Sequence, residues 1–178
     1  MKRNIMIDIE TMGQSANAAI VSIGAVSFDA FGIGEKLYLR ISLEDAAEYG
    51  QLDASTILWW LKQGDEARSE IIKNDTTSPS SAADILSSFI ETNSDENGSV
   101  SIWGNGSDFD NVILSNWYKR IGKAVPWKFW ENRCYRTIKS LFKEIKLERS
   151  GTHHNALDDA VSQAEHLIKI AHAKNIPL

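Results

Sequence analysis

Alternating apolar and polar positions open the chain and predict a strand over residues 5–10. Three isoleucines there alternate with Met6, Asp8 and Glu10, which is the two-residue period of a strand. Further apolar runs predict two more strands, and the Asp-Ala-Phe-Gly sequence at residues 29–32 predicts the turn between them. Short connections of this kind indicate an antiparallel meander. The later strands are expected at residues 20–28 and 36–41.

Helical spacing of apolar residues dominates the rest of the chain. Pro79 after Ser78 opens one helix, since proline suits the first helical turn. A polar loop at residues 92–99 leads into a short buried strand at 100–103. Early strands followed by helices and a further strand predict an α/β fold with a mixed central sheet flanked by helices. Helices are expected at about residues 54–63, 65–73, 78–91, 108–121, 135–145 and 155–174.

Composition narrows the class of protein. The 178 residues, 43% hydrophobic and 24% charged, are ordinary for one globular domain, which we expect to span residues 1–178. The single cysteine, Cys134, excludes an intrachain disulfide and fits a reducing cytoplasm. We find no signal peptide and no run of the ~20 apolar residues that a membrane helix needs. The formal net charge of −5 is at odds with a nucleic-acid binder, unless bound metal ions supply the positive charge.

Asp8 and Glu10 carry the first candidate chemistry. Because they are two apart on a strand, both side chains leave the same face. Buried like charges at that spacing repel each other and are costly to remove from water. A bound cation such as Mg²⁺ would relieve both problems, since hard cations prefer carboxylate oxygens. The alternative is that both acids lie in water at the exposed end of the strand.

Asp110 also has a structural alternative. Ser107 could cap the next helix, and Asp110 three residues later would complete a variant of the capping box. An acid there also suits the helix dipole. However, the Gly-Asn-Gly turn at residues 104–106 follows a buried strand, where α/β folds tend to place functional groups. Asp108 competes with Asp110 for either role.

The last predicted helix separates two neighbouring acids. Successive residues of an α-helix are about 100° apart around its axis. This spacing predicts that Asp159 lies beside Gln163 at the flank of the apolar face, and that Asp158 lies among solvated charges. Asp159 is therefore better placed to reach the sheet. His154, just before the helix, could act as a base near neutral pH. His153 and His154 could instead be a polar loop pair, and a zinc site is less favoured because no Cys or other His is near in sequence. The predicted apolar face consists of Leu157, Ala160, Val161, Ala164, Leu167, Ile168 and Ala171.

Two adjacent tryptophans, Trp59 and Trp60, belong to the helix expected at residues 54–63. The same helical spacing predicts that both tryptophans lie outside the core face of that helix. They would then pack under the next helix, stack on bases as in single-strand binders, or form a homodimer contact. The core face predicted for this helix consists of Ala54, Ile57, Leu58 and Leu61.

Taken together, these segments resemble the DEDD superfamily of 3′–5′ exonucleases, which has an RNase H-like fold. Residues 8–11, Asp-Ile-Glu-Thr, match the first motif, and the segment from Asn105 to Asp110 matches the second. His154-x-Ala156-x-x-Asp159 matches the third. A histidine five residues before the last aspartate is typical of the histidine subgroup, DEDDh. The resemblance spans about residues 4–170.

One spacing points to a branch within this subgroup. Four residues separate Asn105 from Asp110, where the usual second motif has three. With that spacing, the Trp-Gly-Asn-Gly sequence at residues 103–106 and the Leu-Trp-Trp-Leu sequence at residues 58–61 look most like a small branch. That branch includes phage exonucleases and a mycobacterial 3′–5′ exoribonuclease.

The resemblance implies hydrolysis of phosphodiester bonds at the 3′ end of single-stranded RNA or DNA, with release of nucleoside 5′-monophosphates. Asp8, Glu10, Asp110 and Asp159 would hold two divalent metal ions, Mg²⁺ or Mn²⁺, with Asp8 bridging both. One ion would activate the attacking water and the other would stabilise the leaving 3′ oxygen. His154 would take the proton from the water.

Two other functions are compatible with the same carboxylates. An RNase H-like endonuclease would use the same metal chemistry but cut internally. A non-catalytic nucleic-acid-binding relative would keep the acids for structure, although the complete set of four acids with His154 argues against it. Residues expected to contact the substrate are Thr11, Met12, Trp59, Trp60 and Asn105.

Overall fold

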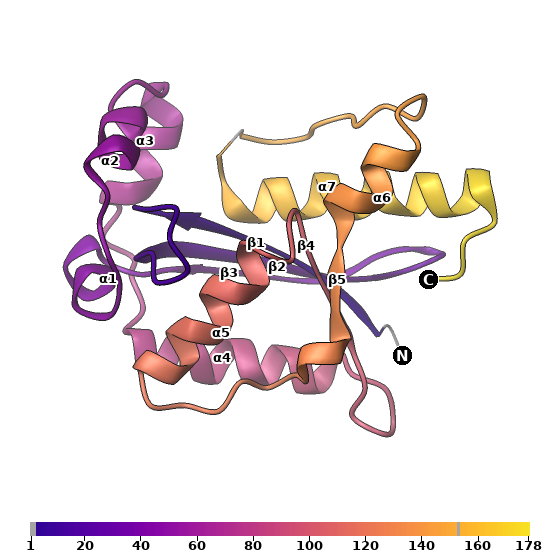
Figure 1. Ribbon diagram of the computed structural model, residues 1–178, viewed down its shortest axis with the longest axis horizontal. Helices are drawn as coiled ribbons and strands as arrows, with labels where there is room; N and C mark the ends of the chain where they lie inside the picture. Colours follow the sequence, from indigo (N-terminus) through magenta and orange to yellow (C-terminus); the bar gives the residue numbers. More distant parts are fainter. Residues whose placement is uncertain (1–2, 153) are drawn as a thin grey trace.

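A mixed five-stranded sheet forms the centre of the structure, a computed structural model that describes residues 3–152 and 154–178 (Figure 1). The strand order is β3-β2-β1-β4-β5. β1 pairs antiparallel with β2, and β2 with β3, whereas β4 runs parallel to both β1 and β5. The predicted mixed sheet and its antiparallel meander are therefore confirmed. The strands are β1 (Asn4–Thr11), β2 (Ile20–Asp29), β3 (Gly32–Arg40), β4 (Ser101–Gly104) and β5 (Asn132–Cys134).

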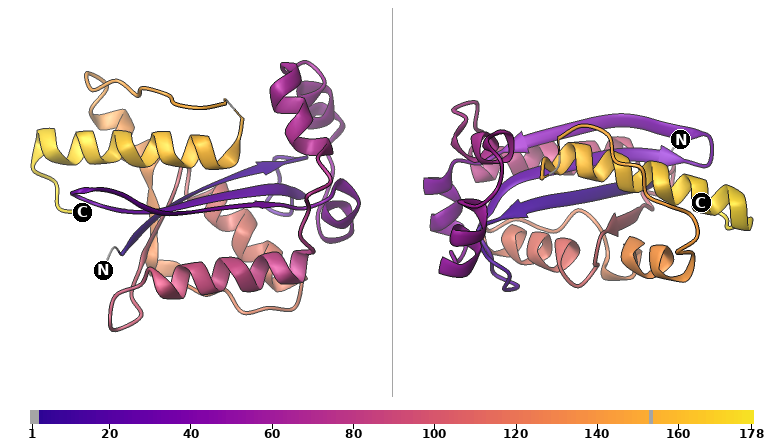
Figure 2. Two further views of the ribbon diagram at one scale, coloured as in Figure 1. Left: turned by 180° about the vertical axis from the view of Figure 1, so that it is seen from behind. Right: turned by 90° about the horizontal axis from the view of Figure 1, so that it is seen from above.

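Helices cover both faces of this sheet. Figures 1 and 2 show α7 lying along one face and α4 and α5 on the other, while α1, α2 and α3 gather at one end of the sheet. α6 packs against α7. Among the described residues, no helix is long and apolar enough to cross a membrane. The helices are α1 (Leu43–Tyr49), α2 (Ala54–Trp60), α3 (Asp65–Ile72), α4 (Pro79–Thr92), α5 (Asp110–Arg120), α6 (Tyr135–Leu141) and α7 (Ala156–Lys174), with a 3-10 turn, η1 (Phe129–Glu131).

The alternation along β1 divides its side chains between two apolar clusters. Ile5 and Ile7 belong to the cluster that includes buried residues of α4 and α5. Met6 belongs to the second cluster, with Ala160 and other residues of α7. Because side chains two apart on a strand share a face, Asp8 leaves β1 on the α7 side. The strand thus directs its acidic positions toward the last helix.

Two glycines let helices approach the sheet closely. Gly24 on β2 is paired with Asp8, and a Cβ atom there would collide with the backbone of Ala156 at the start of α7. At the end of β4, a Cβ atom on Gly104 would lie 2.9 Å from Cβ of Asp110. Larger residues would push either helix away, so both glycines set where the first turns of α7 and α5 lie.

Several elements differ from the sequence expectations. α1, η1 and β5 were not expected, because each is short and none has a clear apolar period. The side chain of Ser42 caps α1 by accepting a hydrogen bond from the Asp45 N–H. α6 ends at Leu141 rather than near residue 145, and α5 begins at Asp110 rather than at residue 108. β3 begins at Gly32, four residues earlier than expected.

The buried face of α2 is also different. Thr56 and Trp60 are its buried residues, whereas the predicted core positions Ala54, Ile57, Leu58 and Leu61 are exposed. The helix is turned this way because Trp60 Nε1 donates a hydrogen bond of 3.0 Å to the backbone oxygen of Thr11. The prediction that Trp60 lies outside the core was therefore wrong. A homodimer contact by this helix stays a prediction.

Candidate active site

Four carboxylates and one histidine, all candidates from the sequence, line a single pocket of about 230 Å³. β1 supplies Asp8 and Glu10. Asp110 is the first residue of α5, and Asp159 lies in the first turn of α7. His154 is two residues before α7. The two ends of the chain and its middle therefore meet at this pocket, as the motif spacing predicts.

Burial makes three of these acids, Asp8, Glu10 and Asp110, hard to ionise. Burial, followed by the charges of Asp110, Glu10 and Asp159, raises the pKa of Asp8 well above its ordinary value. The same causes, burial first and then Asp159 and Asp110, raise the pKa of Glu10 to about 8. Burial raises the pKa of Asp110 to about 7, although backbone N–H groups and Arg136 oppose the shift. A site that keeps all four acids charged near neutral pH needs added positive charge.

Gln163 holds Asp8 in place. Its side-chain Nε2 donates a hydrogen bond of 2.8 Å to Oδ1 of Asp8, and the glutamine is buried. The sequence analysis did not give Gln163 a functional role. Its position four residues after Asp159 was the available signal, since residues four apart share a helix face. α7 therefore contributes two side chains to the same pocket.

Asp110 lies in the pocket rather than serving as a helix cap. Phe109 is the N-cap of α5 and makes no side-chain capping bond, so the capping role considered for Ser107 is wrong. The Asp110 carboxylate accepts hydrogen bonds from backbone groups that include Ile9. Asp108, the competing acid, is exposed. Asp110 is thus the acid of this segment that reaches the site.

Asn105 lies beside this acid, at the turn after β4. It lines the active-site pocket, and its side-chain oxygen Oδ1 is buried without a hydrogen-bond partner in the described part of the chain. A buried polar atom without a partner is costly, so this oxygen is available to a ligand in the pocket. The predicted substrate contact by Asn105 stays a prediction.

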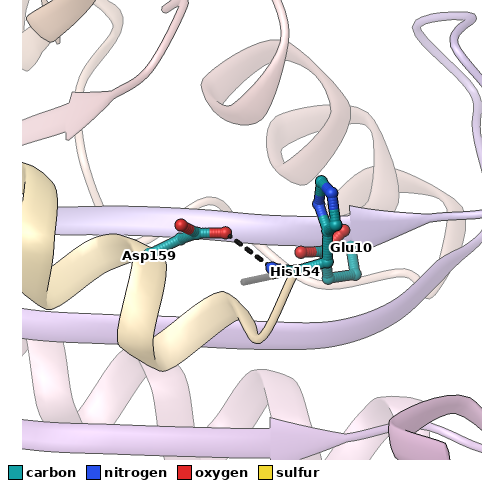
Figure 3. Close-up of side chains that lie close together, drawn as sticks. All are labelled: Glu10, His154 and Asp159. Atoms are coloured by element: carbon teal, nitrogen blue, oxygen red, sulfur yellow. Dashed lines mark hydrogen bonds between the residues drawn. The ribbon is translucent and has the colours of Figure 1, made fainter. Parts of the chain in front are cut away.

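Glu10, His154 and Asp159 lie close enough together to share a ligand (Figure 3). Each offers one donor atom, and these atoms lie within 4.8 Å of one another. The backbone N–H of His154 donates a hydrogen bond of 3.1 Å to Oδ2 of Asp159. Carboxylate oxygens and an imidazole nitrogen suit a divalent cation, so the donor set fits a metal ion at this point.

The backbone of His154 is in the left-handed region, with a φ of 65°. Residues other than glycine rarely adopt this conformation, and it is often found at functional sites. The His154 ring packs edge-on against Trp59, with ring centroids 4.8 Å apart. His153, predicted to matter little, lies outside the described residues. The left-handed turn and Trp59 together direct the His154 side chain.

The two neighbouring acids at the start of α7 have different surroundings. Asp159 is buried and forms an ion pair with Arg149, which is exposed. Asp158 accepts a hydrogen bond of 2.8 Å from the backbone N–H of Thr152 and is partly buried. The prediction of a solvated Asp158 was therefore wrong, because the loop before α7 folds back over it. The helical spacing correctly predicted that Asp159 lies on the side of α7 that faces the sheet.

The remaining substrate-contact candidates divide between two hollows. Thr11, Trp59 and Trp60 line a pocket of about 300 Å³ that also includes Glu10. Met12 instead lines an apolar cavity beside α2 and is buried. Trp59 is 42% exposed, whereas Trp60 is 4% exposed. Trp59 is therefore the tryptophan with a ring free enough to stack on a ligand.

Comparisons of the sequence with known proteins show the family. The model of the Rv2179c-like 3′–5′ exoribonuclease domain family matches residues 3–171. The exodeoxyribonuclease of Enterobacteria phage T4 is 26% identical over 157 residues, covering 75% of this chain and 69% of the phage protein.

Two solved structures share the fold at low sequence identity. The nuclease domain of 3′hExo, described as a DEDDh family member bound to rAMP, aligns with a TM-score of 0.65 and 13% identity, covering 99% of this chain and 95% of that one. S. pombe Pop2p in its Mg²⁺- and Mn²⁺-bound form aligns with a TM-score of 0.68 and 14% identity, covering 98% and 85%.

These likenesses confirm the predicted RNase H-like exonuclease fold. The family match spans nearly the whole chain, and the phage relative belongs to the branch that the motif spacing indicated. The chain therefore belongs to the Rv2179c-like 3′–5′ exoribonuclease domain family.

Proposed function

We propose that this protein is a metal-dependent exonuclease that removes nucleoside 5′-monophosphates from the 3′ end of single-stranded nucleic acid. The observation that carries the proposal is the convergence of four acids on one pocket that also holds His154: Asp110 and Asp159 are buried, and Asp8 and Glu10 are partly buried. Four acids in such a pocket repel a phosphodiester unless cations are bound between them. Membership of an exonuclease family supports the same reaction class.

Two divalent ions, Mg²⁺ or Mn²⁺, are the cations that suit this donor set. Glu10 and Asp159 offer carboxylate oxygens that lie close together, and Asp8 and Asp110 lie beside them in the pocket. Pop2p, which shares the fold, is described with both metals bound. When bound, such ions would supply positive charge to the phosphate and lower the pKa of the attacking water.

The protein's own side chains would then orient the reactants and move the proton. The His154 imidazole would accept a proton from the attacking water, whose oxygen forms a bond to phosphorus. The bond between phosphorus and the 3′ oxygen of the preceding nucleotide breaks, and that oxygen takes up a proton. Gln163 would keep the Asp8 carboxylate aimed into the pocket through their hydrogen bond. The product is a nucleoside 5′-monophosphate.

The pocket of about 300 Å³ beside the acids would receive the terminal nucleoside. Trp59 and Phe109 give it aromatic walls on which a base can stack. The Thr56 hydroxyl in its wall is buried without a hydrogen-bond partner in the described part of the chain, so it can pair with a polar group of the nucleoside. A terminal base must leave its partner strand to enter, which favours single-stranded ends.

RNA and DNA both remain within this proposal. The family is described as exoribonuclease, whereas the phage T4 relative is described as exodeoxyribonuclease. Matched RNA and DNA strands with a 5′ label, incubated with Mg²⁺ or Mn²⁺, should give a descending ladder of products. Addition of EDTA should stop the ladder, and a 3′-terminal phosphate should slow it.

The same assay separates the competing functions. Cleavage of a circular single strand would show an endonuclease. Immediate release of the 5′-labelled mononucleotide would show the opposite polarity. Absence of any cleavage with either metal, while the strand is still bound, would show a non-catalytic binding protein. Each of these results contradicts the proposed exonuclease.

A further inference from the structure

A second groove adjoins the active-site pocket along α6 and the segment that follows it. Its volume is about 410 Å³, and Arg136, Lys139, Lys143 and Lys146 line it together with apolar side chains such as Ile145 and Leu147. We call this hollow the basic groove. Arg136 lines both the basic groove and the active-site pocket, so the two hollows are neighbours.

The charge of this region is opposite to that of the whole protein. The chain has a formal net charge of −5. Between residues 133 and 149, six of the seventeen residues are Lys or Arg and only Glu144 and Glu148 are acidic. This segment therefore has a formal net charge of +4, opposite in sign to that of the whole chain.

The two acids of the segment are neutralised by α7. Glu144 forms an ion pair of 2.6 Å with Lys174, and Glu148 forms one of 2.7 Å with Lys169. Arg136, Lys143 and Lys146, by contrast, form no ion pair with any described residue. Because lysines of α7 pair with both acids of the segment, these acids do not neutralise the groove cations, which can therefore bind an anionic ligand.

The cations of the groove are also close enough to repel one another. Partial burial, followed by the charges of Arg149 and Arg136, lowers the pKa of Lys139. A helix dipole attracts cations near its C-terminus, but that effect falls off within the last turn. Lys143 and Lys146 lie beyond Leu141, the last residue of α6. Helix stabilisation therefore does not account for the whole cluster.

We propose that the basic groove binds the sugar–phosphate backbone of the substrate strand on the 5′ side of the scissile phosphate. This inference rests on the proposed exonuclease function, which puts the 3′ end of a polyanion in the neighbouring pocket. Lysine side chains bind phosphates as point charges and without regard to base sequence. The groove thus makes the enzyme prefer strands that extend beyond a dinucleotide and makes binding dependent on salt.

A pair of lysine substitutions with a matched control tests the groove directly. Lys143→Gln/Lys146→Gln removes two exposed groove cations. Lys36→Gln/Lys119→Gln removes two exposed lysines on β3 and α5, so both variants change the net charge equally. Fluorescence anisotropy would measure binding of a labelled single strand of a dozen nucleotides in EDTA, across a series of salt concentrations.

The groove variant should bind the strand on the order of 10-fold more weakly at low salt, and its slope of log affinity against log salt should fall by about 1.4. The control should keep the wild-type slope. With Mg²⁺ or Mn²⁺, the groove variant should lose roughly 10-fold in kcat/KM on the long strand and less on a dinucleotide, which lacks the upstream phosphates.

Equal slopes in the groove variant and the wild type would overturn the proposal. So would an absence of salt-dependent binding by the wild type, or equal losses on long and short substrates. If the wild type cleaves no strand with either metal, the proposed function fails, but the binding series in EDTA still decides whether the groove holds a phosphate backbone.

Discussion

Two clusters of acids in this protein differ in how their negative charge is balanced. Near β3 and α3, Arg40 contacts Glu70 and Asp75 at 2.6 Å each, and Tyr38 donates a further hydrogen bond to Glu70. Burial works to raise the pKa of Glu70, but hydrogen bonds from Lys73, Arg40 and Tyr38 hold it below its usual value. Every acid in this cluster has a cation from the chain itself.

The active-site pocket leaves most of its acids without such a cation. Asp159 is paired with Arg149, whereas Asp8 and Glu10 have raised pKa values and face other carboxylates. The cluster around Arg40 shows that this fold can balance acids with a guanidinium group. The lack of paired cations beside Asp8 and Glu10 is therefore not imposed by the fold. The difference supports the proposal that metal ions supply the missing positive charge of this site.

The largest expected effect comes from removing one acid of the pocket. Asp8→Ala or Asp159→Asn should lower activity by roughly three orders of magnitude or more, because bound cations would lose an oxygen ligand. Metal-free Asp8→Ala protein should be at least as stable as the wild type, since repulsion with Glu10 is relieved. Steady-state kinetics at saturating metal and thermal unfolding measure the two effects.

Asp108→Asn is the matched control for this pair of variants. Asp108 is exposed and lies two residues before Asp110, so its loss should leave activity close to that of the wild type. Undiminished cleavage by pure Asp8→Ala protein would contradict the site assignment.

Removing the proposed base should have the next largest effect. His154→Ala should lower the rate by roughly 10²–10⁴, as is typical for a lost general base. His153→Ala, one residue earlier, is expected from the motif spacing to have little effect. Single-turnover rates on an end-labelled strand compare the two variants. Equal losses in both would show that the role of His154 is misread.

Breaking the other cluster should change stability rather than chemistry. Arg40→Gln leaves the half-buried Glu70 with fewer donors, so the free energy of unfolding should fall by about 1–3 kcal/mol. Cleavage per folded molecule should hardly change, because Arg40 lies outside the pocket that holds the four acids. Urea unfolding and kinetics on the same preparation test both parts. A fall in kcat as large as that of Asp8→Ala would show that the two clusters are not independent.

The dependence of stability on pH should also separate the two clusters. In the metal-free protein the pKa of Glu10 is raised to about 8 and that of Asp110 to about 7, so the folded state binds more protons than the unfolded state. Their contribution to stability is complete below about pH 4, the range where these acids titrate when unfolded, and is lost as pH rises through 7 and 8. In EDTA, the melting temperature should therefore fall between about pH 5 and pH 8.5.

Added Mg²⁺ or Mn²⁺ should flatten that fall, because ligand binding stabilises the charged acids. Glu70 has the opposite sign, since its lowered pKa adds stability that is lost only as pH falls toward acid values. Scanning calorimetry with and without metal measures the difference. A melting temperature in EDTA that rises from pH 5 to pH 8.5 would contradict the raised pKa values of Glu10 and Asp110 in the metal-free protein.

The smallest effect is expected at Asp158. An asparagine keeps an oxygen that can accept the hydrogen bond from Thr152, so only the negative charge at the start of α7 is lost. Asp158→Asn should therefore reduce stability by about 0.3–1 kcal/mol and keep most of the activity. Comparison with Asp159→Asn in the same assays is the test. A reversed ranking would place the ligand role on Asp158.

The sequence predicted which residues meet at the pocket better than it predicted some of the scaffold; the roles of these residues stay predictions. Strand alternation placed Asp8 and Glu10 on one face, and helix geometry chose Asp159 over Asp158, because both depend on local periodicity. The buried face of α2 could not be read in this way. A tertiary hydrogen bond from Trp60 to Thr11 sets it and leaves apolar residues exposed.

Features that depend on partners far away in the sequence were also missed. β5 has no apolar residue that indicates a strand, and pairing with β4 defines it. The role of Gln163 depends on its hydrogen bond to Asp8, which lies on another element. The role of Gly24 depends in the same way on the close approach of the Ala156 backbone. Such contacts arise from the packing of elements, which local patterns do not contain.

The bond between Gln163 and Asp8 joins residues 155 positions apart. Closing a loop of that length costs about 4.5 kcal/mol of chain entropy beyond a constant, and native contacts must return this free energy. Topologies with such distant contacts fold slowly, so we expect α7 to dock late. A chain in which α7 is absent or has not yet docked therefore carries Asp8 and Glu10 on β1 without Asp159 beside them. Under the proposed function, the set of metal ligands is therefore complete only once α7 has docked on the sheet.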